Sequence, residues 1–205
     1  MKKMTMFFAV FALLFTLGSC DIIEQEIERA ESLKLEGYTV DIPGRSILLK
    51  ITSNADEQVV ERVIINDESY ELVAQGDDWY LLEDIPIAES YDIGNVYYLT
   101  GVGATVPYDV DFSITVEEAI DQLPEEYYTI LEDTTTIGDY TFTSSETGLA
   151  LVESSLEFIQ DEVDDWVWLI MEEDVPKFAL VEVNEIVYII TAPENTADYL
   201  EMEEE

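Results

Sequence analysis

The feature that most constrains the fold is the strict alternation of apolar and polar residues over residues 106–116. Apolar side chains stand at every second position from Tyr108 to Val116. The polar positions between them are Asp109, Asp111, Ser113 and Thr115. Because successive side chains of a β-strand point to opposite faces, this period predicts a strand with one buried and one solvated face. Such half-solvated strands are typical of antiparallel sheets.

A period of two also runs through the residues that precede this segment. The strands predicted in the N-terminal half cover residues 38–42, 46–52, 58–65, 70–74, 79–85, 95–102 and 106–116. Turn-forming sequences separate them, namely PGR, SNADE, NDES, QGDD and YDIGN. Several short strands divided by such turns at regular spacing predict a β-sandwich over residues 38–116.

The segment VERVIINDESYELVAQGDDWYLLEDIP, with NVYYLTGV after it, resembles the Ig-like and fibronectin-III-like modules of bacterial surface proteins. Those modules commonly run through a strand, an Ile-Asn turn, a Tyr-containing strand, an aromatic strand and a Tyr-rich strand. The resemblance implies an Ig-like β-sandwich. The chain departs from true immunoglobulin domains because it holds one cysteine and so lacks their cysteine pair, and the strand topology stays open.

Residues 117–193 carry mixed patterns that predict a small α+β domain. TVEEAIDQL begins with a threonine and two glutamates and stops at Pro124, which predicts a short helix. A second helix is predicted where apolar residues recur on one side, at Leu149, Val152, Leu156, Ile159 and Val163.

The remaining patterns of this half predict strands. WVWLIM (166–171) is apolar on both faces, which predicts a central strand covered from both sides. FALVEV and IVYII, with NE between them, predict a hairpin, and the acidic tail 194–205 is expected to be frayed. The predicted fold class is therefore mainly β, an Ig-like β-sandwich followed by a small α+β domain.

The first twenty residues have the order of a secretory signal. Lys2 and Lys3 precede an apolar run from Met4 to Leu17, and small residues then precede Cys20. The pattern predicts a signal peptide over residues 1–19. A transmembrane anchor is the alternative, because the uncharged stretch is at the short end of what spans a bilayer.

Leu17-Gly18-Ser19-Cys20 resembles the lipobox of bacterial lipoproteins. The resemblance implies that Cys20 becomes the acylated N-terminus of the mature chain, held on the extracytoplasmic face of the cell membrane by a diacylglyceryl group. About two acyl chains are needed for stable anchoring. Helical spacing in DIIEQEIERAESLKLE, before Gly37, predicts that residues 20–37 form a lipid-anchored stalk or short helix.

The charge balance excludes one class of partner and leaves others open. The chain holds 47 acidic and 8 basic residues, a formal charge of −39. Nucleic-acid binding requires cationic groups and is excluded. Hydrophobic residues make up 48% of the chain, which is too many for an acidic disordered protein and predicts a folded protein with an anionic surface. Such a surface fits a saline habitat, divalent cations or a basic partner.

The chain contains no histidine, so catalytic triads with an imidazole base and histidine-containing metal sites are excluded. Carboxylates remain, and Asp109 with Asp111 is the pair considered for glycoside hydrolysis. The candidate cation ligands are Asp77, Asp78, Asp109, Asp111, Asp161, Asp164 and Asp165. None matches the EF-hand spacing, and no metal or other cofactor is predicted.

Trp166 and Trp168 would share one face of the predicted strand and could form a sugar-stacking platform. Val167, Leu169 and Met171 make the opposite face apolar as well, which favours core packing. Trp79 is expected in the sandwich core. These observations predict a non-enzymatic, lipid-anchored interaction or structural module of the cell envelope. Its candidate partners are the membrane, through Cys20, and an envelope protein or polysaccharide. The alternatives are a small solute- or cation-binding lipoprotein and a carboxylate-based cell-wall hydrolase.

Overall fold

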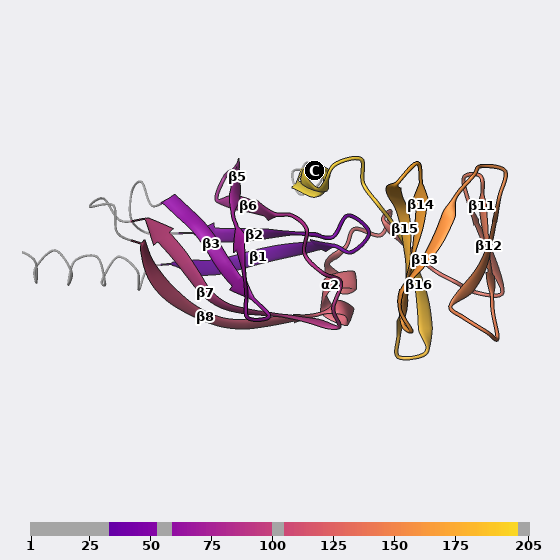
Figure 1. The fold of residues 1–205 in the computed structure, drawn as a ribbon, viewed down its shortest axis with the longest axis horizontal. Helices are drawn as coiled ribbons and strands as arrows, with labels where there is room; N and C mark the ends of the chain where they lie inside the picture. Colours follow the sequence, from indigo (N-terminus) through magenta and orange to yellow (C-terminus); the bar gives the residue numbers. More distant parts are fainter. Residues whose placement is uncertain (1–32, 53–58, 100–104, 201–205) are drawn as a thin grey trace, which may run out of the picture.

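The structure is a computed structural model that describes residues 33–52, 59–99 and 105–200. Figure 1 shows an elongated molecule, with a β-sandwich at one end, helix α2 near the middle, and strands β11 and β12 at the far end. All strand pairs within the described ranges are antiparallel. The predicted mainly β fold is confirmed.

Two four-stranded sheets form the sandwich, in the orders β1-β2-β6-β5 and β4-β3-β7-β8. If the strands β1 to β8 are lettered in chain order as A, B, C, C′, D, E, F and G, the two sheets have the orders A-B-E-D and C′-C-F-G. This is the strand order of Ig-like sandwiches. The bounds are β1 Lys34–Asp41, β2 Ser46–Thr52, β3 Val59–Ile65, β4 Glu68–Glu71, β5 Val73–Gly76, β6 Trp79–Leu82, β7 Ser90–Leu99 and β8 Thr105–Thr115.

Two details of the predicted strands are wrong. The single strand expected at 70–74 is two short strands, because the chain passes at the buried Leu72 from β4 in one sheet to β5 in the other. The sequence YDIGN is not a turn but part of β7. Its glycine lies at a register shift between Ile93 and Asn95, and glycine within a strand often marks such a bulge rather than a chain reversal.

Helix α2, Val116–Gln122, follows the prediction from TVEEAIDQL closely. Thr115 accepts a hydrogen bond from the Glu118 backbone N–H, and the Glu118 carboxylate accepts one from the Thr115 backbone. This capping box satisfies backbone donors that have no partner inside the helix. The apolar residues Val116, Ala119 and Ile120 are buried, so α2 closes one end of the sandwich core.

The C-terminal half contains two further sheets. A five-stranded sheet has the order β13-β14-β15-β16-β9, and a three-stranded sheet has the order β10-β11-β12. The bounds are β9 Tyr128–Ile130, β10 Thr134–Ile137, β11 Tyr140–Ser144, β12 Ala150–Ser154, β13 Ile159–Asp164, β14 Val167–Glu172, β15 Val175–Val183 and β16 Ile186–Thr191. The predicted β15–β16 hairpin is confirmed, with both turn residues, Asn184 and Glu185, at positive φ.

The helix predicted over 149–163 is wrong, since this segment forms strands β12 and β13. Five apolar residues of the segment have the spacing of one helix face, but the apolar Leu151 and Phe158 do not lie on that face. Ala150 and Val152 instead alternate with exposed Leu151 and Glu153 along β12, which pairs with β11. Tertiary pairing therefore decides a segment whose own pattern is ambiguous.

Two groups of buried residues show how the sheets are stacked. The larger group joins the sandwich to one face of the five-stranded sheet, through Val167, Leu169, Ala179, Val181 and Ile190. The smaller group lies on the other face, and it holds Tyr140, Phe142, Leu149, Ala150, Ile170, Phe178, Leu180 and Ile189. The prediction that WVWLIM is covered on both sides is confirmed, because successive residues of β14 belong to different groups.

The predictions for the N-terminal stalk and for the C-terminal tail are both wrong in the parts that the structure describes. Residues 34–37 belong to β1 and not to a stalk helix, because Lys34, Leu35 and Gly37 pair with the end of β2. Residues 20–32 lie outside the described ranges. The tail is folded as far as the 3₁₀ helix η1, Thr196–Leu200, with Tyr199 buried. Within the described ranges, no helix has the length and apolar character needed to cross a membrane.

Asp41 holds the C-terminal segment against the sandwich. Its carboxylate accepts hydrogen bonds from the Gly44 backbone N–H and from Thr196 Oγ1, both at 2.9 Å. The Ser46 hydroxyl lies 2.7 Å from Thr196 Oγ1. Asp41 is 2% exposed and is the only buried acidic residue in the described part of the chain. Burial raises the pKa of the Asp41 carboxyl above 3.8, although the two hydrogen bonds act against that rise.

Because the pKa of Asp41 is higher in the folded state, its contribution to stability is greatest below the unfolded pKa and falls as the pH rises through the folded value. We expect Asp41→Asn, which keeps an acceptor oxygen, to be at least as stable as the parent at neutral pH. Its advantage should disappear as the pH falls toward about 4. Asp41→Ala leaves donors unpaired and should cost about 1–3 kcal/mol.

Chemical denaturation at several pH values measures these differences. The matched control is Asp78→Asn, at an exposed turn position. A parent protein that loses stability relative to Asp41→Asn as the pH falls would contradict the assignment.

Candidate functional site

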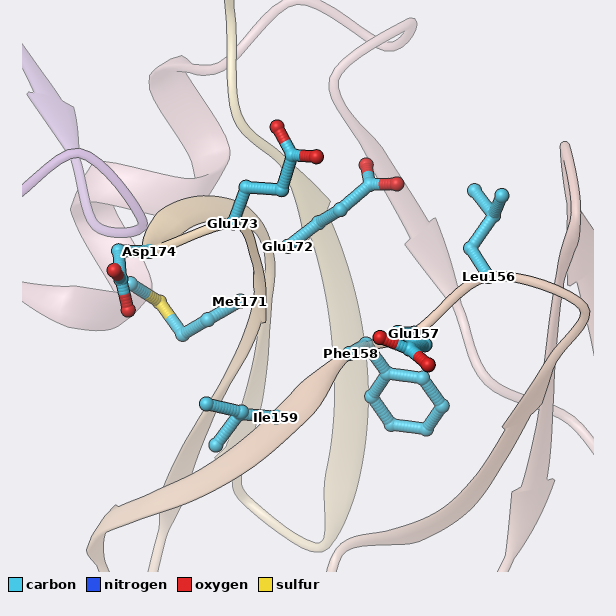
Figure 2. A pocket seen from close by; sticks show the side chains of 8 residues that line it. All are labelled: Leu156, Glu157, Phe158, Ile159, Met171, Glu172, Glu173 and Asp174. Carbon is cyan, nitrogen blue, oxygen red and sulfur yellow. The ribbon is translucent and has the colours of Figure 1, made fainter.

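An open groove of about 770 Å³ lies on the surface of the C-terminal half. It is lined by Leu156, Glu157, Phe158, Ile159, Met171, Glu172, Glu173 and Asp174. Figure 2 shows the carboxylates of Glu172 and Glu173 along one side, with Met171 and Ile159 below them. Half of the lining is thus acidic and half is apolar. We call these eight residues the groove.

Strand pairing brings the two halves of the groove together. Ile159 and Met171 are register partners in the β13–β14 pair, so two segments a dozen positions apart lie side by side. The hairpin between β14 and β15 turns at Glu173 and Asp174, both at positive φ. This turn places three consecutive acidic residues where β14 ends. The sequence before β13 supplies Leu156 and Phe158 on the opposite side.

The apolar side chains of the groove are unusually accessible. Ile159 is 61% exposed and Leu156 is 40% exposed, and Val175, beside the turn, is 52% exposed. Phe158 is anchored below, because its ring packs edge-on against Tyr140 with centroids 5.8 Å apart. Apolar side chains grouped at the surface beside charged ones are a mark of interaction sites.

The charge of the groove is compensated only in part. Lys177 Nζ lies 3.7 Å from Glu172 Oε2, and the Lys177 side chain is 44% exposed. Lys177 is the only basic residue after position 116. The groove therefore presents a net negative potential over an apolar floor, and it can accept a group that is both cationic and apolar.

The predicted cation ligands do not converge. Within the described ranges, no three residues among His, Cys, Asp and Glu are arranged to hold a metal ion. The exposed pair Asp77–Asp78 forms the β5–β6 turn, with both residues at positive φ. The other candidates lie on β8, on β13 and in the turn after β13, namely Asp109, Asp111, Asp161, Asp164 and Asp165. All of these side chains are exposed.

Asp109 and Asp111 are not a regular same-face pair. Asp109 faces Asn95, whereas Asp111 has a φ of 45° at the register shift between β7 and β8. The bulge interrupts the alternation on which the proposed carboxylate pair relied.

The tryptophans pack into the protein rather than forming a joint platform. Trp79 is buried in the sandwich core, as predicted. Trp166 packs against the larger buried group and Trp168 against the smaller one, so they do not share a face. A Cβ on Gly148 would overlap the Trp168 ring, which explains the glycine there. Trp166 also lines a second hollow of about 300 Å³ between the halves, with Glu89, Glu117 and Glu182 among its neighbours.

No protein-family model matches the chain, and the searches of curated proteins and of solved structures return no match. Cys20 lies outside the described residues, so its predicted lipidation stays a prediction. The sequence patterns do not predict the groove, because the apolar spacing of 149–163 predicts a helix where the groove has its first half. One sequence feature does indicate this site. The acids of MEED (171–174) directly follow an apolar strand, a pattern that indicates a charged turn beside a core strand.

Proposed function

We propose that this protein is a lipid-anchored, extracytoplasmic protein of the cell envelope that works as a non-catalytic interaction module. The observation that carries the proposal is the groove, in which exposed Leu156 and Ile159 lie beside four carboxylates. In a protein with this high net charge, polar surface favours solubility, whereas exposed aliphatic side chains do not. Accessible aliphatic residues gathered at one place are therefore best explained by a partner that covers them.

The arrangement along the molecule supports this function. Asp41, the last residue of β1, accepts a hydrogen bond from Thr196 in the C-terminal segment. Lys34, the first residue of β1, lies at the opposite end of the strand, where it pairs with Thr52, the last residue of β2. β1 therefore begins on the side of the sandwich away from the C-terminal half (Figure 1). An anchor that precedes β1 would therefore join the sandwich at the end farther from the groove.

Lipidation at Cys20 is tested by mass spectrometry of the membrane-extracted protein. We expect a mature chain that begins at an acylated Cys20, because the lipobox resemblance places the modification there. Cys20→Ser should remain unprocessed at this site and lose its diacylglyceryl group. A mature chain that begins at Met1, or a Cys20→Ser chain that is still processed, would contradict the anchor.

The orientation is tested with a cysteine introduced next to the groove. Cys20 is the only cysteine in the chain, and the proposed lipid occupies its sulfur. Ser155→Cys therefore adds the only free thiol, at an exposed position next to the groove. A membrane-impermeant maleimide applied to intact cells should label this variant and not the parent. Labelling that requires lysed cells would place the groove on the wrong side of the membrane.

A further inference from the structure

We propose that the groove binds an extended cationic segment of another protein, in which basic and apolar side chains alternate, and that this segment continues along the open edge of β13. The inference rests on the proposed function and names the chemistry of the partner for the same site. Three features of the groove and its surroundings carry it: the exposed apolar floor, the excess of carboxylates, and the edge strand beside them.

The apolar floor provides room for aliphatic side chains. Ile159 and Leu156 project at 61% and 40% exposure, and Met171 lies next to Ile159 as its register partner. A purely polar ligand would leave this surface in contact with water. A partner that carries apolar residues removes it from water, at a gain of free energy that grows with the area covered.

The excess of carboxylates selects the charge of the partner. Glu157, Glu172, Glu173 and Asp174 line the groove. Among the described residues, Lys177 alone forms an ion pair with any of them, at 3.7 Å. Basic side chains of a partner can place their charges on these acids while their aliphatic stems lie along the apolar floor.

The edge strand provides the backbone template. β13 is the outermost strand of its sheet and, in the part of the chain that the structure describes, pairs only with β14. An extended segment can add to such an edge through main-chain hydrogen bonds. The regular part of this edge runs from Ile159 to Glu162, since the register shifts between Glu162 and Asp164.

The acids on β13 distinguish between possible occupants. Asp161, Glu162 and Asp164 would lie against their own counterparts if a second copy paired here, and like charges across strands are unfavourable. The same acids would face opposite charges in a basic segment. The edge is thus protected against self-association and remains open to a cationic strand.

The test uses the full chain in detergent micelles and a fluorescent peptide of about ten residues, an ordinary strand length, with alternating lysine and valine. We expect saturable binding that weakens as salt is raised to about 0.15 M. A lysine–serine peptide of the same length should bind about tenfold less tightly, because it cannot cover the apolar floor. Peptide binding should also slow amide exchange from Ile159 to Glu162.

Groove variants and matched controls locate the site. Ile159→Ser should weaken lysine–valine binding about tenfold, and Glu157→Gln with Glu173→Gln should do the same at low salt and reduce the salt dependence. The controls make equal chemical changes on exposed parts of the sandwich: Val73→Ser, and Asp77→Asn with Asp78→Asn. These should leave the affinity unchanged within about twofold. Leu156→Ser repeats the apolar test at a second position.

Three outcomes would overturn the proposal. Equal losses in the groove and control variants would show general attraction to an acidic surface. A concentration-dependent dimer of the parent that Ile159→Ser abolishes would show that a second copy fills the groove. Equal binding of the lysine–serine peptide would remove the role of the apolar floor. A failed anchor at Cys20 would not affect this assay, so the two proposals can fail separately.

Discussion

Replacing Phe142 by alanine should lower the free energy of unfolding by about 3–5 kcal/mol, the usual cost of emptying a buried aromatic site. Phe142 is fully buried at the centre of the smaller buried group. Its ring meets Phe178 edge-on at 5.2 Å and stacks near Tyr140 at 6.4 Å. The loss would be a large fraction of the stability of an ordinary domain, about 5–15 kcal/mol.

The damage should be concentrated in the far end of the molecule. The β10–β12 sheet gives its buried residues Tyr140, Phe142 and Ala150 to the smaller group, whereas the sandwich core belongs to the larger one. In Phe142→Ala, amide exchange should therefore accelerate first in β10–β12 and least in the sandwich.

Urea denaturation measures the total loss in the free energy of unfolding. The control is Leu151→Ala, at a position of β12 that is 59% exposed. It should change the stability by no more than about 0.5 kcal/mol. Uniform acceleration of exchange over the whole chain would instead show one cooperative unit and argue against the proposed division into residues 38–116 and 117–193.

Raising sodium chloride from low concentration to about 1 M should increase the melting temperature by about 10 °C. The chain carries a formal charge of −39 with 8 basic residues, and folding brings those carboxylates closer together than an expanded chain does. Like charges at neighbouring positions of a helix or of paired strands cost roughly a few tenths of a kcal/mol each, so many pairs together amount to several kcal/mol. For a chain of this size, each kcal/mol of added stability raises the melting temperature by about 2–4 °C.

Calcium separates repulsion from a specific cation site. At about 1 M salt the screening length is about 3 Å, so general repulsion is suppressed. At matched ionic strength, calcium should then add little to the melting temperature, since the described acids do not gather into a metal site. A site would produce a saturable rise, because a ligand that binds only the folded state stabilises by RT ln(1 + [L]/Kd). A melting temperature that does not respond to sodium chloride would contradict the repulsion argument.

The sequence by itself determined the elements whose local pattern and local physics agree. Alternation predicted the strands of the sandwich, and β2 has the predicted bounds, Ser46–Thr52. Thr115 and Glu118 predicted the start of α2, because a capping box is made entirely by neighbours in the chain. The apolar run 166–171 predicted a strand covered on both faces, because strands that are buried on both faces have continuous rather than alternating apolar sequences.

Only the tertiary structure decided what depends on pairing between distant residues. The apolar spacing of 149–163 fits a helix, but pairing with β11 and β14 makes the segment two strands. Asp41 and Thr196, 155 positions apart, meet because the C-terminal segment returns to the sandwich. The groove exists because the β13–β14 register sets Ile159 beside Met171. Local patterns report which faces of a segment are apolar, but the partner that covers or exposes each face is chosen by the packing of the whole chain.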